Sequence, residues 1–179
     1  MLEPLPVKET FIPPLLSSPY PNLDVPHFIT IVEHEFRELT EASTLAAKLS
    51  SYTPNRSMTS VGLSEIFLNA IEHGNLGLAY STKTLFASEK KWFEEINKRI
   101  LDPENQDKYV RVTTEETPHY IKFTVIDKGA GFDFEQYENV KTVPLNNRNG
   151  RGILISKEAV FDKLIYFYPG NKVECIIYK

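Results

Sequence analysis

The chain has 179 residues, of which 41% are hydrophobic, and a formal net charge of −4. This length supports one globular core, and the weak acidity gives no electrostatic reason to expect direct binding of nucleic acid or of an anionic membrane surface. A single cysteine, Cys175, excludes an intramolecular disulfide and a cysteine-based zinc site.

No apolar run in the sequence reaches the roughly 18 to 20 residues that cross a bilayer. The first residues also lack the basic segment followed by an uninterrupted apolar run that marks a secretory leader. We therefore expect a cytoplasmic protein.

The first 26 residues form a segment of distinct composition, because they hold seven of the twelve prolines. Proline fixes φ and removes a backbone donor, so this arm is expected to be extended or polyproline-like, and neither a helix nor a central strand. The sequence leaves open whether the arm packs across the domain, packs on a partner or trails in solvent. We divide the chain into this arm, 1–26, and one domain, 27–179.

The first half of the domain reads as a strand followed by two helices. Residues 28–32 (FITIV) are β-branched and aromatic, which predicts a strand, and residues 36–52 carry apolar side chains at helical spacing. The central helix follows a break at 53–55, with Ser57 or a neighbour as its cap. It is expected to end at residues 73–74, where Gly74 suits the left-handed position after a helix.

The second half begins with an insertion, 76–108, that contains an amphipathic helix with a solvated charged face. Residues 109–116 and 120–127 predict a hairpin, 133–149 a loop, and 152–161 a short helix. A final hairpin, 163–179, completes the chain. Strands in local hairpins favour an α+β fold with about five strands and with helices on one face of the sheet.

The central helix, VGLSEIFLNAIEHG at 61–74, carries a polar seam opposite its apolar face. The residues of the seam are Glu65, Asn69, Glu72 and His73. Glu65 and Asn69, four residues apart, point the same way. An amide oxygen together with substrate phosphates is a suitable set for magnesium, and the adjacent carboxylate is placed to accept a proton.

A second polar group follows the strand at 120–127. Asp127 is in phase with the inward row of that strand, and a carboxylate pointing toward the core needs a partner. The turn after it contains Gly129 and Gly131, which allow the backbone to approach another group closely.

A third group lies near residue 150. The backbone N–H groups of Gly150 and Gly152, at the start of the expected helix, form a candidate anion site, and Arg148 and Arg151 add charge for a terminal phosphate. Neither the phosphate-binding loop GxxxxGK[ST] nor the three-glycine dinucleotide fingerprint is present.

Three stretches in this order resemble the N box and the two glycine boxes of the histidine-kinase-like ATPase superfamily, which includes gyrase and mismatch-repair ATPases. They are EIFLNAIEHGN (65–75), DKGAGF (127–132) and NGRGI (149–153). Within that superfamily the chain most resembles anti-sigma factor serine kinases and related ATPase modules attached to some bacterial response regulators. The resemblance covers 61–179 well and 28–60 loosely, and the insertion at 76–108 and the proline-rich arm are departures from the compact kinase pattern.

The resemblance implies a two-layer α/β sandwich of the Bergerat type, with a mixed, mainly antiparallel sheet, that binds ATP and Mg²⁺. It implies that Asn69 holds the metal, that Glu65 is the general base and that Asp127 accepts a hydrogen bond from the adenine amino group. Gly129 and Gly131 would let the backbone run close to the adenine and ribose. Gly150 and Gly152, with Arg148 and Arg151, would surround the phosphates.

The implied partners are proteins. Kinases of this family transfer the γ-phosphate to a serine of an anti-anti-sigma factor, and the same surface holds a sigma factor when that partner is absent. The alternative is a non-catalytic interaction module in which ATP, or no nucleotide, only fixes the partner-binding surface. The sequence leaves open which protein is the partner and whether the chain forms a homodimer.

Residues 33–38 (EHEFRE) resemble the phosphoacceptor box of sensor histidine kinases around His34. Those proteins place that histidine on a long helical hairpin, well before the ATPase domain. Here the central helix begins only about thirty residues later, which leaves no room for such a hairpin. We therefore expect His34 to be a surface histidine.

Overall fold

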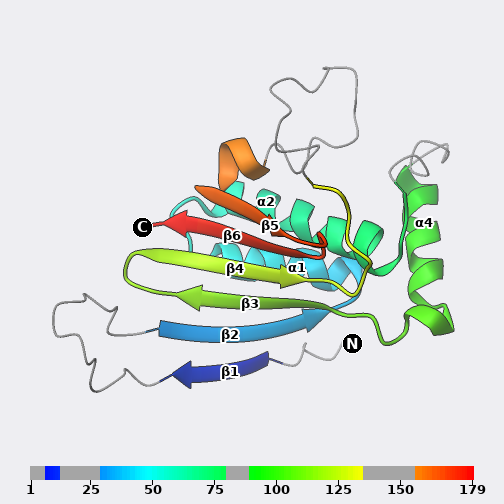
Figure 1. Ribbon diagram of the computed structural model, residues 1–179, viewed down its shortest axis with the longest axis horizontal. Helices are drawn as coiled ribbons and strands as arrows, with labels where there is room; N and C mark the ends of the chain where they lie inside the picture. Colours follow the sequence, from blue (N-terminus) through cyan, green and yellow to red (C-terminus); the bar gives the residue numbers. More distant parts are fainter. Residues whose placement is uncertain (1–6, 13–28, 80–88, 135–155) are drawn as a thin grey trace.

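The computed structural model describes residues 7–12, 29–79, 89–134 and 156–179 (Figure 1). The strands are β1 (Val7–Ile12), β2 (Ile29–Phe36), β3 (Val110–Glu116), β4 (Tyr120–Ile126), β5 (Lys163–Phe167) and β6 (Lys172–Tyr178). The helices are α1 (Leu39–Ser50), α2 (Arg56–Asn69) and α4 (Glu89–Ile100), with π-helical segments η1 (Ala70–Asn75) and η3 (Ser156–Val160) and a 3-10 turn η2 (Pro103–Asn105).

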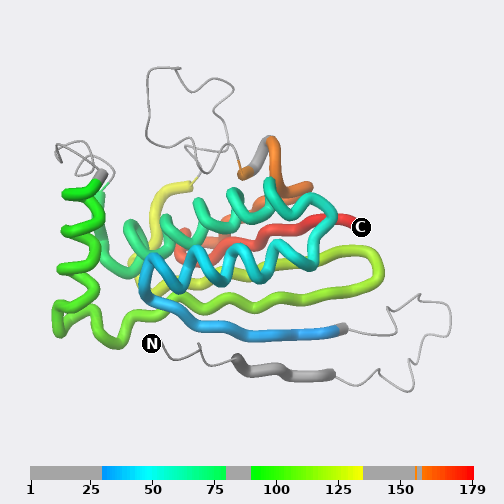
Figure 2. The backbone as a smooth tube through the Cα atoms, turned by 180° about the vertical axis from the view of Figure 1, so that it is seen from behind, coloured from blue at the N-terminus to red at the C-terminus, as the bar shows by residue number. Residues whose placement is uncertain are grey.

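The six strands form one sheet in the order β1-β2-β3-β4-β6-β5, and every pairing is antiparallel. Helices α1 and α2 lie side by side across one face of this sheet, and α4 stands at one end of it (Figures 1 and 2). The predicted α+β, two-layer architecture with helices on one face is therefore confirmed. The described sheet has one more strand than expected and contains no parallel pair.

Alternation along the strands places the core between the sheet and the helices. Ile121, Phe123 and Val125 of β4 are buried, whereas the residues between them lie on the opposite face. The ring of Phe36 on β2 lies 5.0 Å from that of Phe67 on α2, measured between centroids, and so joins the two layers.

The first strand of the domain is longer than its sequence predicts. Strand β2 continues to Phe36 because residues 30–36 pair with 110–116 of β3. Helix α1 accordingly begins at Leu39 and not near residue 36. Glu38 and Glu41 form a capping box at this start. His34 lies inside this strand and is 2% exposed, so the expectation of a surface histidine was wrong.

Helix α2 starts at its expected break, with the Asn55 side chain accepting a hydrogen bond from the Met58 N–H at 3.3 Å. Its predicted end was wrong. The helix continues as η1 through Asn75, and Gly74 does not adopt a left-handed conformation. The positive φ falls instead at Gly77, at 60°, after the π-helical turn has finished.

Part of the proline-rich arm belongs to the sheet. Residues 7–12, which contain no proline, form β1 and pair with β2 from Val7 opposite His34 to Ile12 opposite Ile29. This segment is extended, as expected, and takes the edge position that proline-flanked strands tolerate.

Two further helices were predicted. The insertion contains α4, and η3 lies in the described part of 152–161. None of the described helices is long and apolar enough to cross a membrane.

Candidate functional site

A cavity of about 500 Å³ opens between the C-terminal part of α2, the segment that follows η1, the turn after β4 and the β5–β6 turn. This volume lies within the roughly 300 to 1,000 Å³ of small-molecule sites. Its wall is mostly apolar, formed by Ile66, Ala70, Leu78, Val125, Ala130, Phe132, Tyr166 and Val173. Its polar side chains include Asn69, His73, Asp127 and Asn171.

Asp127 is the carboxylate on this wall. Its Oδ1 accepts a hydrogen bond from the Gly129 N–H at 2.7 Å, and its own N–H donates to the Asn171 carbonyl at 3.0 Å. Burial raises the pKa of Asp127 to about 6, against the lowering effect of the Gly129 bond. The protein therefore keeps a carboxylate that acts as an acceptor at neutral pH in surroundings that disfavour its charge.

Two glycines allow the helix end and the turn after β4 to meet. A Cβ on Gly74 would lie 2.5 Å from Oδ1 of Asp127, and a Cβ on Gly129 would lie 2.5 Å from the Gly74 carbonyl oxygen. Gly131 adopts a φ of 85°, which favours glycine, and packs against Pro169. Gly129 and Gly131, expected to let the backbone approach a ligand, thus also let it approach neighbouring protein backbone.

Two asparagines secure the same turn, and the sequence reasoning did not assign either of them. The Asn75 Oδ1 accepts from the Lys128 N–H at 2.7 Å. The Asn171 Nδ2 donates to the carbonyls of Asp127, at 3.5 Å, and of Gly129, at 3.4 Å. Asn75 directly follows Gly74, and Asn171 lies in a hairpin turn. From the sequence alone, asparagine at such positions indicates a local helix cap or turn, and its hydrogen bonds to a distant segment are not predicted.

The polar seam of the central helix divides between two environments. Asn69 lines the cavity, whereas Glu65, one turn earlier, is not among the described residues that form its wall. The other predicted phosphate contacts, Arg148, Gly150, Arg151 and Gly152, lie outside the described residues. Asn69 and Asp127 are therefore brought to one cavity, and the phosphate-binding end of the predicted site is not described.

Glu72 anchors the insertion. It is 3% exposed and accepts a hydrogen bond from the Trp92 Nε1–H on α4 at 2.9 Å. Arg99 of α4 donates to the Leu76 carbonyl at 3.3 Å. These bonds hold α4 beside the segment 77–79, which lines the cavity, so the insertion supports one side of the site.

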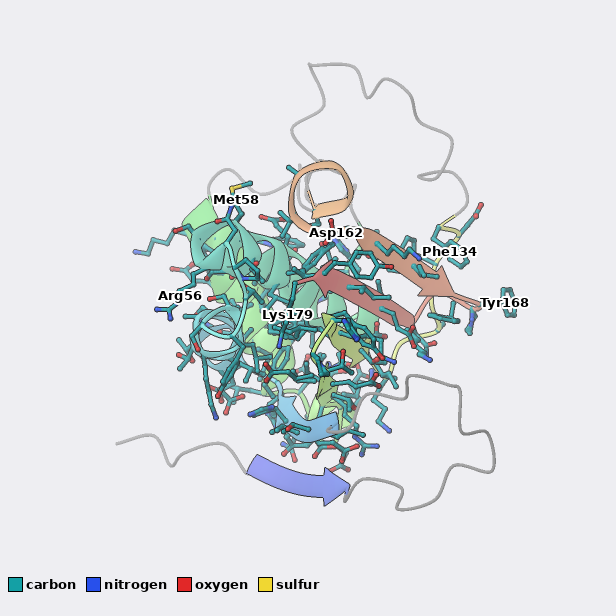
Figure 3. The ribbon with its side chains drawn as sticks, turned by 90° about the vertical axis from the view of Figure 1, so that its left-hand side faces the viewer. Arg56, Met58, Phe134, Asp162, Tyr168 and Lys179 are labelled. Carbon is teal, nitrogen blue, oxygen red and sulfur yellow. The ribbon has the colours of Figure 1, made fainter. Side chains whose placement is uncertain are left out.

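His73 also faces the cavity, and its Nδ1 is hydrogen-bonded to the Leu78 carbonyl. That bond fixes the chain just after η1. An aromatic cluster includes two residues of the wall: the Tyr166 ring is 5.2 Å from that of Phe132 and 5.8 Å from that of Phe134 between centroids. Figure 3 shows Phe134 beside β5, at the same edge of the sheet as the exposed Tyr168.

The residues present fit the base of a nucleotide. A partly buried carboxylate on a largely apolar wall suits a planar heterocycle that donates one N–H to it, because this bond compensates for the desolvation of the carboxylate. The described residues contain no group of three or more histidine, cysteine, aspartate or glutamate side chains that could hold a metal ion. A magnesium ion held by Asn69 and by phosphates does not need such a group.

No protein-family model matches this chain, and no curated protein matches it in sequence.

Proposed function

We propose that this chain is a cytoplasmic ATP-binding regulatory protein that phosphorylates a serine of a protein partner, or sequesters that partner in its ATP-bound form. The observation that carries the proposal is the Asp127 carboxylate, half-buried on the apolar wall of a cavity of about 500 Å³. The Gly129 N–H satisfies one oxygen of this carboxylate, and a ligand donor in the cavity would offset the remaining cost of burying its charge.

In this proposal each residue of the site has one task. Asp127 accepts the adenine amino group, and Ile66, Leu78 and Val173 enclose the base. Asn69 holds Mg²⁺, and ATP supplies the phosphoryl group. Glu65 accepts the proton of the attacking serine hydroxyl, while the segment with Arg148, Gly150, Arg151 and Gly152 binds the phosphates. Most of the catalysis in such a transfer comes from positioning and charge neutralisation.

The partner would be a protein of the anti-anti-sigma class, or a sigma factor, as the resemblance of the three motifs implies. A specific observation favours a second function, an interaction module that binds ATP without turnover. Glu65, the proposed base, is not among the described residues of the cavity wall, although Asn69 and Asp127 are.

Calorimetric titration of ATP, with and without magnesium, tests the nucleotide site. We expect magnesium-dependent binding that weakens in Asn69→Ala, and a loss of affinity in Asp127→Asn that does not depend on the metal. No heat at millimolar nucleotide, which corresponds to binding weaker than about −4 kcal/mol, would contradict the proposal.

Incubation of the chain with ATP, magnesium and candidate partners then separates the kinase from the module. Phosphorylation of a partner serine that is lost in Glu65→Ala, with ATP affinity retained, supports the kinase. ATP-dependent partner binding without phosphate transfer supports the module.

A further inference from the structure

Residues 74 and 75, at the end of η1, hold residues 127–129 at several consecutive points. Gly74 leaves room for the Asp127 carboxylate, and its carbonyl lies against Gly129. Asn75 accepts the Lys128 N–H at 2.7 Å, a bond between residues 53 apart in the chain. The end of the central helix and the glycine turn are therefore one structural unit.

Asn75 is itself rigidly placed. It is 3% exposed, and its carbonyl accepts a hydrogen bond from the Lys108 Nζ at 3.0 Å. Lys108 also donates to the Asn105 Oδ1 at 2.8 Å, which ties η1 to the residues that follow α4. Because the backbone of Asn75 is held in this way, its side-chain oxygen can hold the Lys128 peptide in one orientation.

The side chain of Asn75 is poorly suited to a purely stabilising role. Within the part of the chain that the structure describes, its Nδ2 is buried and has no hydrogen-bond partner. A buried donor left unsatisfied destabilises a fold, and an apolar side chain of similar volume would avoid that loss. The amide is therefore best explained by its oxygen, which contacts the turn next to Asp127.

We propose that Asn75 is a positioning residue of the candidate nucleotide site. It holds the Lys128 peptide so that the next N–H, that of Gly129, stays on Oδ1 of Asp127, and the other carboxylate oxygen is left to meet a ligand in the cavity. The contribution of Asn75 to nucleotide affinity rests on the proposed function, whereas its hold on the turn does not.

The first test measures amide hydrogen exchange by NMR in the full chain without nucleotide. In Asn75→Leu, the amides of Lys128 and Gly129 should exchange about tenfold faster relative to that of Phe123 in the same sample, since tenfold corresponds to about 1.4 kcal/mol, which is within the range for one lost hydrogen bond. Thr59→Val is the matched control, because Thr59 is also buried, at 1% exposed, and loses a side-chain hydrogen bond to Thr53, but it lies at the start of α2 and does not contact the turn, Asn75 or Lys108. Unchanged exchange at Lys128 in Asn75→Leu would overturn the proposal.

A second variant keeps the test decisive if Asn75→Leu does not fold. Asn75→Asp retains the acceptor oxygen, so the Lys128 amide resonance should show a titration step from the new carboxylate that is absent in the wild-type chain, where the neighbouring Asp127 titrates alone. A Lys128 titration identical to that of the wild type would also overturn the proposal.

The last measurement separates this inference from the proposed function. ATP affinity, measured by calorimetry, should weaken about tenfold in Asn75→Leu and change less than about twofold in Thr59→Val. Faster exchange at Lys128 with undiminished ATP affinity would refute the positioning role. If the wild-type chain binds no ATP, the proposed function fails, while the exchange data still decide whether Asn75 holds the turn.

Discussion

Replacing Asp127 by asparagine should stabilise the protein and, if the proposed function holds, weaken its binding of ATP. The substitution keeps the shape of the side chain and an oxygen for the Gly129 N–H, which lies 2.7 Å from Oδ1. It removes a charge whose burial raises the pKa of Asp127 from 3.8 to about 6. It also presents the ligand with an amide, which cannot accept a hydrogen bond with the strength of a carboxylate.

The magnitude follows from that pKa. Between pH 3.8 and about 6 the folded protein holds a proton that the unfolded chain has released, so the folded state loses stability as pH rises through this range. Each pH unit corresponds to about 1.4 kcal/mol, which sets a ceiling of about 3 kcal/mol above pH 6. Solvent screening of the partly exposed carboxylate reduces this, and we expect Asp127→Asn to add about 1 to 2 kcal/mol at pH 7.5.

The assay is urea denaturation of both proteins at pH 7.5 and pH 4, with ATP calorimetry at pH 7.5. The gain in unfolding free energy should be present at pH 7.5 and nearly absent at pH 4, where folded Asp127 is already protonated. Asp107→Asn, at an exposed position, should change neither stability nor affinity. A loss of stability at pH 7.5 in Asp127→Asn would refute the reasoning, because the carboxylate would then serve the fold and not a ligand.

Three further predictions follow from the same contacts. ATP affinity should fall as pH decreases through about 6, when Asp127 gains its proton, and the residual affinity of Asp127→Asn should fall less steeply over that range; calorimetry at several pH values checks this. Gly74→Ala should cost about 1 to 3 kcal/mol in urea denaturation, because its Cβ would lie 2.5 Å from Oδ1 of Asp127, and most of this loss should disappear in an Asp127→Ala background. Trp92→Phe removes the donor to buried Glu72 and should lower the free energy of unfolding by about 2 to 3 kcal/mol. Phe93→Leu, at a side chain that is 45% exposed, should lower it by under about 1 kcal/mol. Thermal and urea denaturation measure both losses, and nearly equal losses in the two variants would mean that the Glu72 bond contributes little.

The sequence predicted those parts of the fold that depend on local periodicity. The hairpin of β3 and β4 and the inward phase of Asp127 follow from alternation within seven residues, and Asn69 faces the cavity because helical spacing held as far as residue 69. These features need no knowledge of distant partners.

The remaining features depend on contacts between distant residues. Strand β2 runs on through a polar EHEF segment because β3 pairs with it, although alternation alone ended the strand at residue 32. The π-helical turn at 70–75 changes the register of the helix, so that Glu72 meets Trp92 on the insertion and Asn75 meets Lys128. A regular helix, with 100° between successive residues, would place Glu72 and Asn69 on the same polar face. In the structure Asn69 lines the cavity, whereas Glu72 contacts Trp92 of the insertion.

The pairing of β1 with β2 has a practical consequence for handling this protein. Shortening the chain at residue 27, at the composition boundary, would remove β1 and turn β2 into the edge of the sheet. The N–H and C=O groups now paired with residues 7–12 would then be open to a strand of another molecule, which promotes aggregation. Purified material that begins before residue 7 should therefore stay monodisperse at concentrations where the shortened protein self-associates, and light scattering of the two proteins would show the difference.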